Sequence, residues 1–365
     1  MKKLLFILIA AIGLSSCNKP QTCEVDLTSG ISTRSFKMGF STWPYGPFDD
    51  QKEKTYQYLA QNGDIYMELM NINIPWSAWI NNTFMPEAFV TETTLKLNNK
   101  IEGMPMLLTV SLLNTSRSDL KEDYDGTIPQ YTHLYDTTIE NAYVKHLSYL
   151  IDKFDPDYMV IAMEINELKL SSETKWQEYK QLMANVRQRL KEKYPDLPLS
   201  ESITLHDLYS PEGVEDVEAY RKDVFDYVNE NCDFIAVSFH PFLKDMHGYE
   251  QFQEAFDLLN NSTDKPIAIV ESSYIAENLT LLTWGVSIKS DPCQQDEFLQ
   301  TLLLNASDNN YMFVIWWAFR DYDLLWSFCP VGVRAACRIW RDTGLLDGKG
   351  KERIAYGTWN KIFKL

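Results

Sequence analysis

One stretch constrains the fold more than any other: an apolar, partly β-branched run that begins at Tyr158 and ends in the polar pair Asn166-Glu167. A proline-containing break comes directly before it. Such a run is typical of a strand buried on both faces, as in a parallel sheet covered by helices. The stretch 265–273 repeats the pattern and carries Glu271 near its end. The sequence therefore predicts two buried strands that each present a Glu at the carboxyl end.

The remaining chain shows the same alternation of strands and helices. Helical segments such as Asp49 to Asn62, which Gly63 ends, separate the apolar runs. Strands are expected near 36–40, 64–70, 105–112, 158–165, 198–205, 233–241, 265–273 and 311–318. This order predicts an α/β fold, a single-domain (β/α)8 TIM barrel over residues 36–365. Glu167 and Glu271 would end its fourth and seventh strands, on the face where such barrels carry active sites.

The N-terminus has the pattern of a sorting signal rather than of a folded element. Two lysines precede an apolar stretch, Leu4 to Leu14, which is too short to span a bilayer. Leu14-Ser15-Ser16-Cys17 resembles a bacterial lipobox, which implies a signal peptide over 1–16, lipidation of Cys17 and a tether over 17–35. An ordinary secretory signal is the alternative. The prediction is a lipid-anchored protein of the bacterial cell envelope, at the outer membrane or cell surface, with no other membrane contact.

Charge and cysteine content limit the partners. A formal net charge of −17 argues against nucleic acid and anionic membranes, which basic patches bind, and is compatible with a neutral glycan. The chain has no CxxC or HExxH spacing, so neither a metal nor another cofactor is predicted. Cys232 is expected to be a buried thiol, and disulfides are expected among Cys293, Cys329 and Cys337, with the pairing open. The sequence does not indicate an oligomeric state.

Two facing carboxylates can hydrolyse a glycosidic bond. A retaining mechanism needs them about 5–5.5 Å apart, one protonated as acid and the other ionised as nucleophile. The alternative is that each Glu is a structural ion-pair partner at a strand end. Glu164 has the opposite strand parity to Glu167, so we expect it to pair with a buried cation or hydroxyl.

The strand ends also carry a family resemblance. Asn-Glu after the fourth strand and Glu271 after the seventh resemble clan A retaining glycoside hydrolases. Within that clan the chain is most similar to the endo-β-1,4-galactanase family, glycoside hydrolase family 53. The similar phrases are Ser238 to Phe242, Val270 to Tyr274 and Thr343 to Gly350. The resemblance implies that Glu167 is the acid/base, that Glu271 is the nucleophile and that Asn166 holds the sugar 2-hydroxyl. The family usually has Tyr at the positions of Phe239 and His240, a departure that affects the substrate contacts.

Further residues at the predicted rim are candidates for substrate contact. His240 is expected to bond the nucleophile or a sugar hydroxyl, and Arg320 to orient a carboxylate. Strand alternation allows only one of Trp316 and Trp317 to face the barrel mouth. For every candidate, core packing or a surface role is the alternative. The full set is His240, His206, Trp316, Trp317, Trp43, Asn71, Trp76 and Arg320.

The sequence thus favours a retaining glycoside hydrolase that cleaves a β-linked oligo- or polysaccharide, for example a galactan. The alternative from another class is a non-catalytic, surface glycan-binding lipoprotein on the same barrel. A serine esterase is disfavoured because the chain lacks a G-x-S-x-G elbow.

Overall fold

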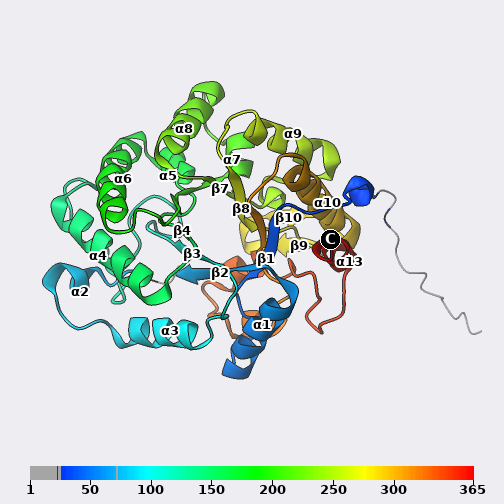
Figure 1. Ribbon diagram of the computed structural model, residues 1–365, viewed down its shortest axis with the longest axis horizontal. Coiled ribbons are helices and arrows are strands. Elements are labelled where there is room, and N and C mark those ends of the chain that lie inside the picture. Colours follow the sequence, from blue (N-terminus) through cyan, green and yellow to red (C-terminus); the bar gives the residue numbers. More distant parts are fainter. Residues whose placement is uncertain (1–22, 24–25, 71–72) are drawn as a thin grey trace, which may run out of the picture.

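Parallel strands form the centre of the molecule and helices surround them (Figure 1). The computed structural model describes residues 23, 26–70 and 73–365. The predicted signal peptide, Cys17 and Asn71 lie outside these residues. The strands of the main sheet are β1 (Lys37–Ser41), β2 (Ile65–Met70), β3 (Met106–Val110), β4 (Tyr158–Val160), β5 (Leu199–Ser200), β6 (Ser202–Thr204), β7 (Ile235–Phe239), β8 (Ile267–Ser272) and β11 (Phe313–Trp316).

The sheet has the order β5-β4-β3-β2-β1-β11-β8-β7-β6, with parallel pairs throughout. Only Glu201 separates β5 from β6, and the two segments occupy the place of one interrupted strand. The first and last members of the order are thus continuous in the chain, and the sheet forms an eight-stranded ring. The predicted single-domain (β/α)8 barrel is confirmed.

Helices fill the crossovers between the strands, as parallel pairing requires. The longest, α6, begins at the Ser172 cap, has Glu173 in its first turn and ends in lysines, which suits the helix dipole. The helices are α1 (Asp49–Asn62), α2 (Trp76–Asn81), α3 (Glu87–Asn98), α4 (Thr137–Phe154), α5 (Asn166–Ser171), α6 (Glu173–Lys193), α7 (Leu205–Tyr209), α8 (Val217–Asn231), α9 (Gly248–Asn260), α10 (Pro292–Asp308), α11 (Asp323–Phe328), α12 (Arg334–Ile339) and α13 (Ile354–Phe363).

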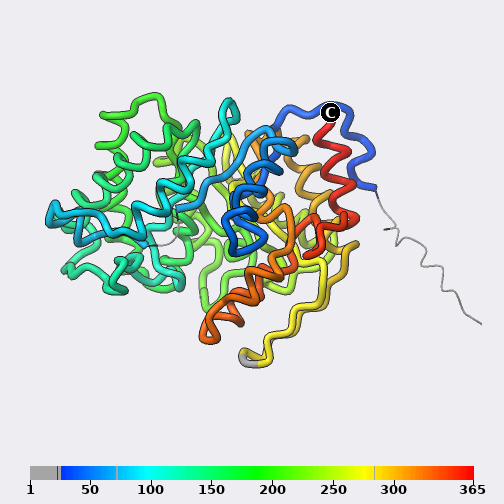
Figure 2. Tube along the Cα trace, turned by 90° about the horizontal axis from the view of Figure 1, so that it is seen from below, coloured from blue at the N-terminus to red at the C-terminus, as the bar shows by residue number. Residues whose placement is uncertain are grey.

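Short elements are inserted at the barrel's loops. They include the 3₁₀ turns η1 (Leu27–Gly30), η2 (Pro241–Lys244) and η3 (Leu282–Trp284), and a hairpin of β9 (Leu279–Leu281) and β10 (Val286–Ile288). The hairpin, in yellow, and the α11–α12 segment, in orange, project from the same side of the molecule (Figure 2). The sequence predicted neither the hairpin nor α2, α11 and α12, because each is too short to show a clear period. It also missed α3, a 12-residue helix in which only Phe89 and Thr93 are buried.

The barrel has two apolar layers because its strands are buried on both faces. Every residue of β2, β3, β7 and β8 is buried. One layer fills the barrel itself and includes Ile65, Leu107, Val160, Ala236 and Ala268. The other packs the outer strand faces against the helices. The continuous apolar runs in the sequence therefore reflect double burial.

The fourth strand is shorter than predicted. It ends at Val160, five residues before the expected end at Ile165. The backbone then turns, with Glu164 in the left-handed region at φ 59°, and α5 begins at Asn166. The backbone N–H groups of Glu164 and Ile165 donate to the hydroxyl and carbonyl of Ser202, each at 2.9 Å. This departure from strand geometry decides which side chain enters the site.

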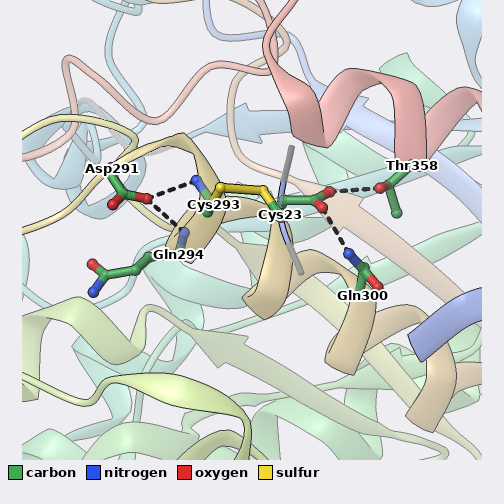
Figure 3. The surroundings of a disulfide bond; sticks show 7 residues. Cys23, Asp291, Cys293, Gln294, Gln300 and Thr358 are labelled. Carbon is green, nitrogen blue, oxygen red and sulfur yellow. Dashed lines mark hydrogen bonds between the residues drawn. A yellow bond between two sulfur atoms is a disulfide. The ribbon is translucent and has the colours of Figure 1, made fainter. Parts of the chain in front are cut away.

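The predicted tether over 17–35 is corrected in its described part. Thr28 and Ile31 are buried, and the backbone N–H of Leu27 donates to Gln300 Oε1 at 2.6 Å. Cys23 forms a disulfide with Cys293 at the start of α10, beside the Asp291 side chain that caps this helix (Figure 3). Residues 26–35 therefore pack on the barrel instead of hanging free.

This disulfide also corrects the expected cysteine pairing. Cys293 bonds to Cys23 and not to Cys329 or Cys337, a contact between chain positions 270 residues apart that no local pattern indicates. Cys232 is a buried free thiol, as predicted. Among the described residues, no helix is long and apolar enough to cross a membrane.

Candidate active site

Glu271 lies within β8, where the strand reaches the carboxyl end of the barrel. Its side chain is only 9% exposed. His240 follows the neighbouring β7, and its Nε2 lies 3.2 Å from Glu271 Oε1 while its Nδ1 bonds the Ser273 hydroxyl at 2.8 Å. Burial raises the pKa of Glu271, and the contact with His240 offsets only part of that rise.

Glu164 extends into the same site from the turn after β4. Arg117 donates to Glu164 Oε2 from Nε at 3.0 Å and also from Nη2. The Arg117 backbone has φ 50°, and its Nη1 bonds the Asn114 carbonyl at 3.1 Å. Burial alone would raise the pKa of Glu164, but the arginine outweighs burial and lowers it. Glu164 thus has the buried cationic partner that its parity predicted.

Glu164, His240 and Glu271 meet at one point. Their side-chain ligand atoms all lie within 4.8 Å of one another. The separation of the two carboxylates is close to the 5–5.5 Å of a retaining pair. Left-handed backbone in a non-glycine residue is uncommon and often marks a functional site, and both Glu164 and Arg117 have it.

The same three residues offer donor atoms that a divalent cation accepts. Arg117 already neutralises Glu164, however, and a second cation beside the guanidinium would be repelled. A second acidic group, Glu277, Asp321 and Asp342, is compensated in the same way, because Arg353 pairs with Glu277 and Asp321. Neither cluster of described residues has a charge balance that calls for a metal.

Glu167, the predicted partner of Glu271, lies elsewhere. It is on α5, and the charged groups that most affect its pKa are Glu164, Arg117, Asp207 and Lys244. Burial and the nearby Glu164 charge raise the pKa of Glu167 to about 8. The structure brings Glu164, not Glu167, to Glu271. Strand alternation fails as a guide here because β4 has already ended.

Asn166 is buried and fully engaged within the protein. Its Nδ2 donates to the Thr204 hydroxyl at 2.9 Å and to the Tyr220 hydroxyl at 3.1 Å, and its Oδ1 accepts from the Thr204 N–H at 2.7 Å. No part of the amide is left for a sugar hydroxyl. The predicted sugar contact is therefore corrected: Asn166 anchors the start of α5 to the fifth strand.

Three further candidates also belong to the scaffold. Trp76 is buried against Tyr143 and donates to the Lys121 carbonyl at 2.7 Å. Trp316 packs outward on Phe298 and donates to the Thr343 carbonyl at 2.9 Å. Arg320 bonds the Gly348 carbonyl at 2.6 Å and stacks on Tyr45, so it orients no catalytic carboxylate.

Aromatic rings line the mouth beside the carboxylates. Trp317 stacks near Trp43 with ring centroids 5.1 Å apart, and Trp340 lies 4.5 Å from the His240 ring. Tyr322 contacts Trp43 at 5.9 Å. Within the part of the chain that the structure describes, the indole N–H groups of Trp43 and Trp317 have no hydrogen-bond partner. Both N–H groups are buried, so what these rings offer to a sugar is their apolar faces.

His206 helps to hold the backbone of His240 in place. Its Nδ1 accepts the backbone N–H of His240 at 3.3 Å, and burial lowers its pKa to about 4, so the ring is neutral. Sequence reasoning missed Glu164 as the facing carboxylate, and it missed Arg117 and Trp340 altogether. One signal could have found Glu164: a strand of usual length, about 5–6 residues, starting at Tyr158 would end just before it. Arg117 and Trp340 lie in irregular loops that no periodicity places.

The chain resembles known proteins in its fold but not in its sequence. No family model matches the chain, and no curated protein matches it in sequence. The solved structures with a similar fold include clan A glycoside hydrolases of families 53, 5 and 17.

Among them is the glycoside hydrolase family 53 catalytic domain of Ignisphaera aggregans, with a TM-score of 0.60, 15% identity, and coverage of 94% of this chain and 99% of that one. A family 5 subfamily 18 protein of Bifidobacterium longum, in complex with Manβ1-4GlcNAc, has a TM-score of 0.64, 13% identity, and coverage of 90% and 78%. An exo-β-1,4-mannosidase of an Opitutaceae bacterium has a TM-score of 0.64, 10% identity, and coverage of 90% and 59%. At these identities the likeness establishes the barrel fold.

Proposed function

We propose that the protein is a retaining glycoside hydrolase of a β-linked glycan, with Glu271 as nucleophile and Glu164 as acid/base. The observation that carries the proposal is the pair of carboxylates whose oxygens lie within 4.8 Å of each other at the carboxyl ends of β4 and β8, strands that do not pair with each other in the barrel. The similar structures support the class, since they include a family 53 catalytic domain and a β-mannosidase. Glu164 therefore takes the acid/base role that was expected of Glu167.

In the first step, a Glu271 oxygen attacks the anomeric carbon and forms an ester bond to it. The glycosidic C–O bond breaks at the same time, and Glu164 gives its proton to the departing oxygen. Trp317 and Trp43 offer an apolar stacking surface for the sugar that is attacked.

In the second step, water replaces the leaving group. Glu164, now ionised, removes a proton from this water, whose oxygen bonds to the anomeric carbon while the ester C–O bond breaks. Glu271 is released as a carboxylate and Glu164 is protonated again. Two inversions at one carbon retain the anomeric configuration.

Arg117 affects which of the two carboxyl groups carries the proton before the first step. An acid must carry its proton before it can donate it, yet the arginine holds the pKa of Glu164 below its ordinary value. In turn, the raised pKa of Glu271 keeps a proton on the nucleophile. One proton shared by the pair therefore favours Glu271 in the unliganded site. We propose that glycan binding loosens the Arg117–Glu164 ion pair and shifts this proton to Glu164.

The same ion pair is the specific observation that favours the alternative function, a surface glycan-binding protein. If Arg117 never leaves Glu164, the site binds sugars on its aromatic rim without cleaving them. Tight binding of one glycan with no product after long incubation would support this alternative.

The deciding experiment is incubation with a panel of β-linked plant and host glycans, with released reducing ends and oligosaccharides as the readout. Proton NMR of the first product reports its anomeric configuration, and retention is expected. Glu271→Gln should abolish cleavage and Glu164→Gln should slow it by about 10²-fold or more, whereas Glu167→Gln should leave it nearly unchanged. Cleavage that survives Glu164→Gln but not Glu167→Gln would return the acid role to Glu167.

We also propose that lipid on Cys17 anchors the protein to the bacterial cell envelope. The support is the sequence Leu14-Ser15-Ser16-Cys17, and the cysteine lies outside the described residues. Metabolic labelling with a fatty-acid analogue should mark the protein, and Cys17→Ser should remove both the label and the membrane association. Label that persists in Cys17→Ser would refute the anchor.

A further inference from the structure

The segment that follows β11 has little apolar packing to hold it. This segment, residues 323–343, contains α11 and α12 and is called here the β11 flap. None of the side chains in its two helices, all of which the structure describes, is buried. Phe328 is 60% exposed and Val331 85% exposed. Burial of apolar surface is the main force that fixes most elements, so the flap needs another constraint.

Polar contacts fold the flap back on itself. The Trp326 indole N–H donates to the Arg334 carbonyl at 3.0 Å, and the Arg334 guanidinium donates to the Cys329 carbonyl at 3.1 Å. At its other end the Tyr322 hydroxyl donates to the Cys337 carbonyl at 3.3 Å. These contacts bring the two flap cysteines near each other, and both thiols are free in the structure.

The chain already contains one disulfide, between Cys23 and Cys293. Structural disulfides persist where thiols are oxidised and are rare in reducing compartments. Cys329 and Cys337 are the remaining neighbouring pair and are partly exposed, whereas Cys232 is buried beside Arg187. Two adjacent, accessible thiols would meet the same oxidant that joined the first pair.

We infer that Cys329 and Cys337 form a second disulfide, which cross-links the β11 flap. The bond arises by thiol–disulfide exchange with an oxidised disulfide, either a protein or a small molecule. Each thiol loses one proton, the pair gives up two electrons, and the oxidant leaves as a dithiol. Partial burial and the neighbouring sulfur raise the pKa of Cys329 to about 11, which is unlike the reactive thiolate of a catalytic dithiol and fits a structural bond.

The cross-link would act on the mouth of the site. The flap carries Trp340, whose ring lies 4.5 Å from His240 and 6.3 Å from Trp317. Closing the loop between the two cysteines restricts the conformations that this part of the chain can adopt. The bond would therefore hold Trp340 as one wall of the mouth, next to the histidine that contacts Glu271.

The test is a cysteine map of the full-length protein from its native envelope. Free thiols are alkylated without reductant before proteolysis, and the peptides are analysed by mass spectrometry. We expect a cross-linked peptide pair that contains Cys329 and Cys337, with Cys232 alkylated. Alkylation of both Cys329 and Cys337 overturns the inference, whether or not the Cys23–Cys293 bond survives.

A variant measures the effect on the flap without depending on catalysis. The double change Cys329→Ser and Cys337→Ser should make tryptic cleavage at Arg334 and Arg338 several-fold faster, while Cys232→Ser, the matched control, should not. Mild reductant should accelerate cleavage of the wild type but not of the double variant. Equal rates in all forms would show that no disulfide constrains the flap. Because the readout is proteolysis, this result stands apart from success or failure of the proposed hydrolase activity.

Discussion

The two carboxylates of the site reach it by different routes. Glu271 belongs to β8, whose strand pairing continues to Ser272, opposite Phe239 of β7. Glu164 comes four residues after the end of β4 and takes its direction from a left-handed turn held by Ser202. Strand pairing, with a register shift directly before Glu271, places the one, and a specific set of side-chain and backbone contacts places the other.

The side chains that contact Glu271 and Glu164 also come from different kinds of structure, a strand end and a loop. Glu271 faces His240, which the adjacent strand supplies at the same level of the barrel. Glu164 faces Arg117, which extends from the long loop after β3. The histidine leaves the pKa of Glu271 raised, whereas the arginine lowers that of Glu164. Glu271 therefore has a fixed environment, whereas Glu164 has a partner, Arg117, that a movement of its loop could remove.

Removing each carboxylate in turn is the strongest test of this comparison. Glu271→Gln should abolish cleavage of every substrate, because no other group can form the glycosyl ester. Glu164→Gln should slow cleavage of natural glycans by about 10²–10⁴-fold, the usual contribution of a general acid. With an activated aryl glycoside, whose leaving group needs no proton, formation of the ester should be nearly normal in Glu164→Gln.

The measurement is a set of initial rates with the glycan and the aryl glycoside for both variants. Glu167→Gln is the matched control, since it removes a neighbouring carboxyl that does not face Glu271. If the three variants lost activity equally on both substrates, the separate roles of Glu164 and Glu271 would be wrong.

The contrast also explains how much could be predicted from the sequence. The barrel and all eight strand positions followed from apolar runs, because double burial leaves a continuous signal in parallel strands. Glu271 and His240 followed as well, because both lie at or beside the end of a buried strand. Trp317 was separated from Trp316 by alternation, and the structure places only Trp317 at the mouth.

The rest of the site could not be read in this way. Glu164 enters through a backbone turn that depends on Ser202 of the next strand, a tertiary contact with no local pattern. Asn166 looked like a sugar ligand because it is polar at an apparent strand end, but Thr204 and Tyr220 bind its amide. Trp76 was assigned to the rim for the same reason, and it is buried in the core.

A change in Arg117 should show whether its ion pair is a removable constraint. Arg117→Met takes away the cation that lowers the pKa of Glu164, so that pKa should rise. In the unliganded site Glu271 has the higher pKa of the pair, so the acidic limb of the pH profile for kcat/KM reports Glu164, and this limb should move to higher pH. The limb for kcat should move less, because bound glycan has already loosened the pair.

The check is a full pH profile of both parameters for wild type and Arg117→Met. Arg117→Lys, which keeps a positive charge, is the matched control and should stay close to wild type. Equal shifts in kcat and kcat/KM would mean that the arginine stays on Glu164 throughout the reaction, against the proposed loosening.

His240→Gln should affect the opposite limb. The contact with His240 lowers the pKa of Glu271, so its removal should raise that pKa further. Glu271 holds the shared proton in the unliganded site, so activity is lost as pH rises through its pKa and the pair loses that proton. The basic limb of kcat/KM should therefore move to higher pH while the acidic limb stays in place. A shift of the acidic limb instead would place the histidine on the acid, not on the nucleophile.

The smallest change in activity is expected at Asn166, whose amide anchors the start of α5 to the fifth strand. Asn166→Ala leaves the Thr204 N–H without its acceptor and removes the amide bond to the Tyr220 hydroxyl, which should cost about 1–3 kcal/mol of unfolding free energy. Urea unfolding measures that loss. A sugar ligand would behave differently, because its removal would raise KM and leave stability nearly unchanged. We expect lower stability with KM close to wild type, since the backbone of Glu164 is still held by Ser202. A higher KM with unchanged stability would instead mean that Asn166 contacts the glycan. The glycan would then reach the end of β4 as well as the end of β8.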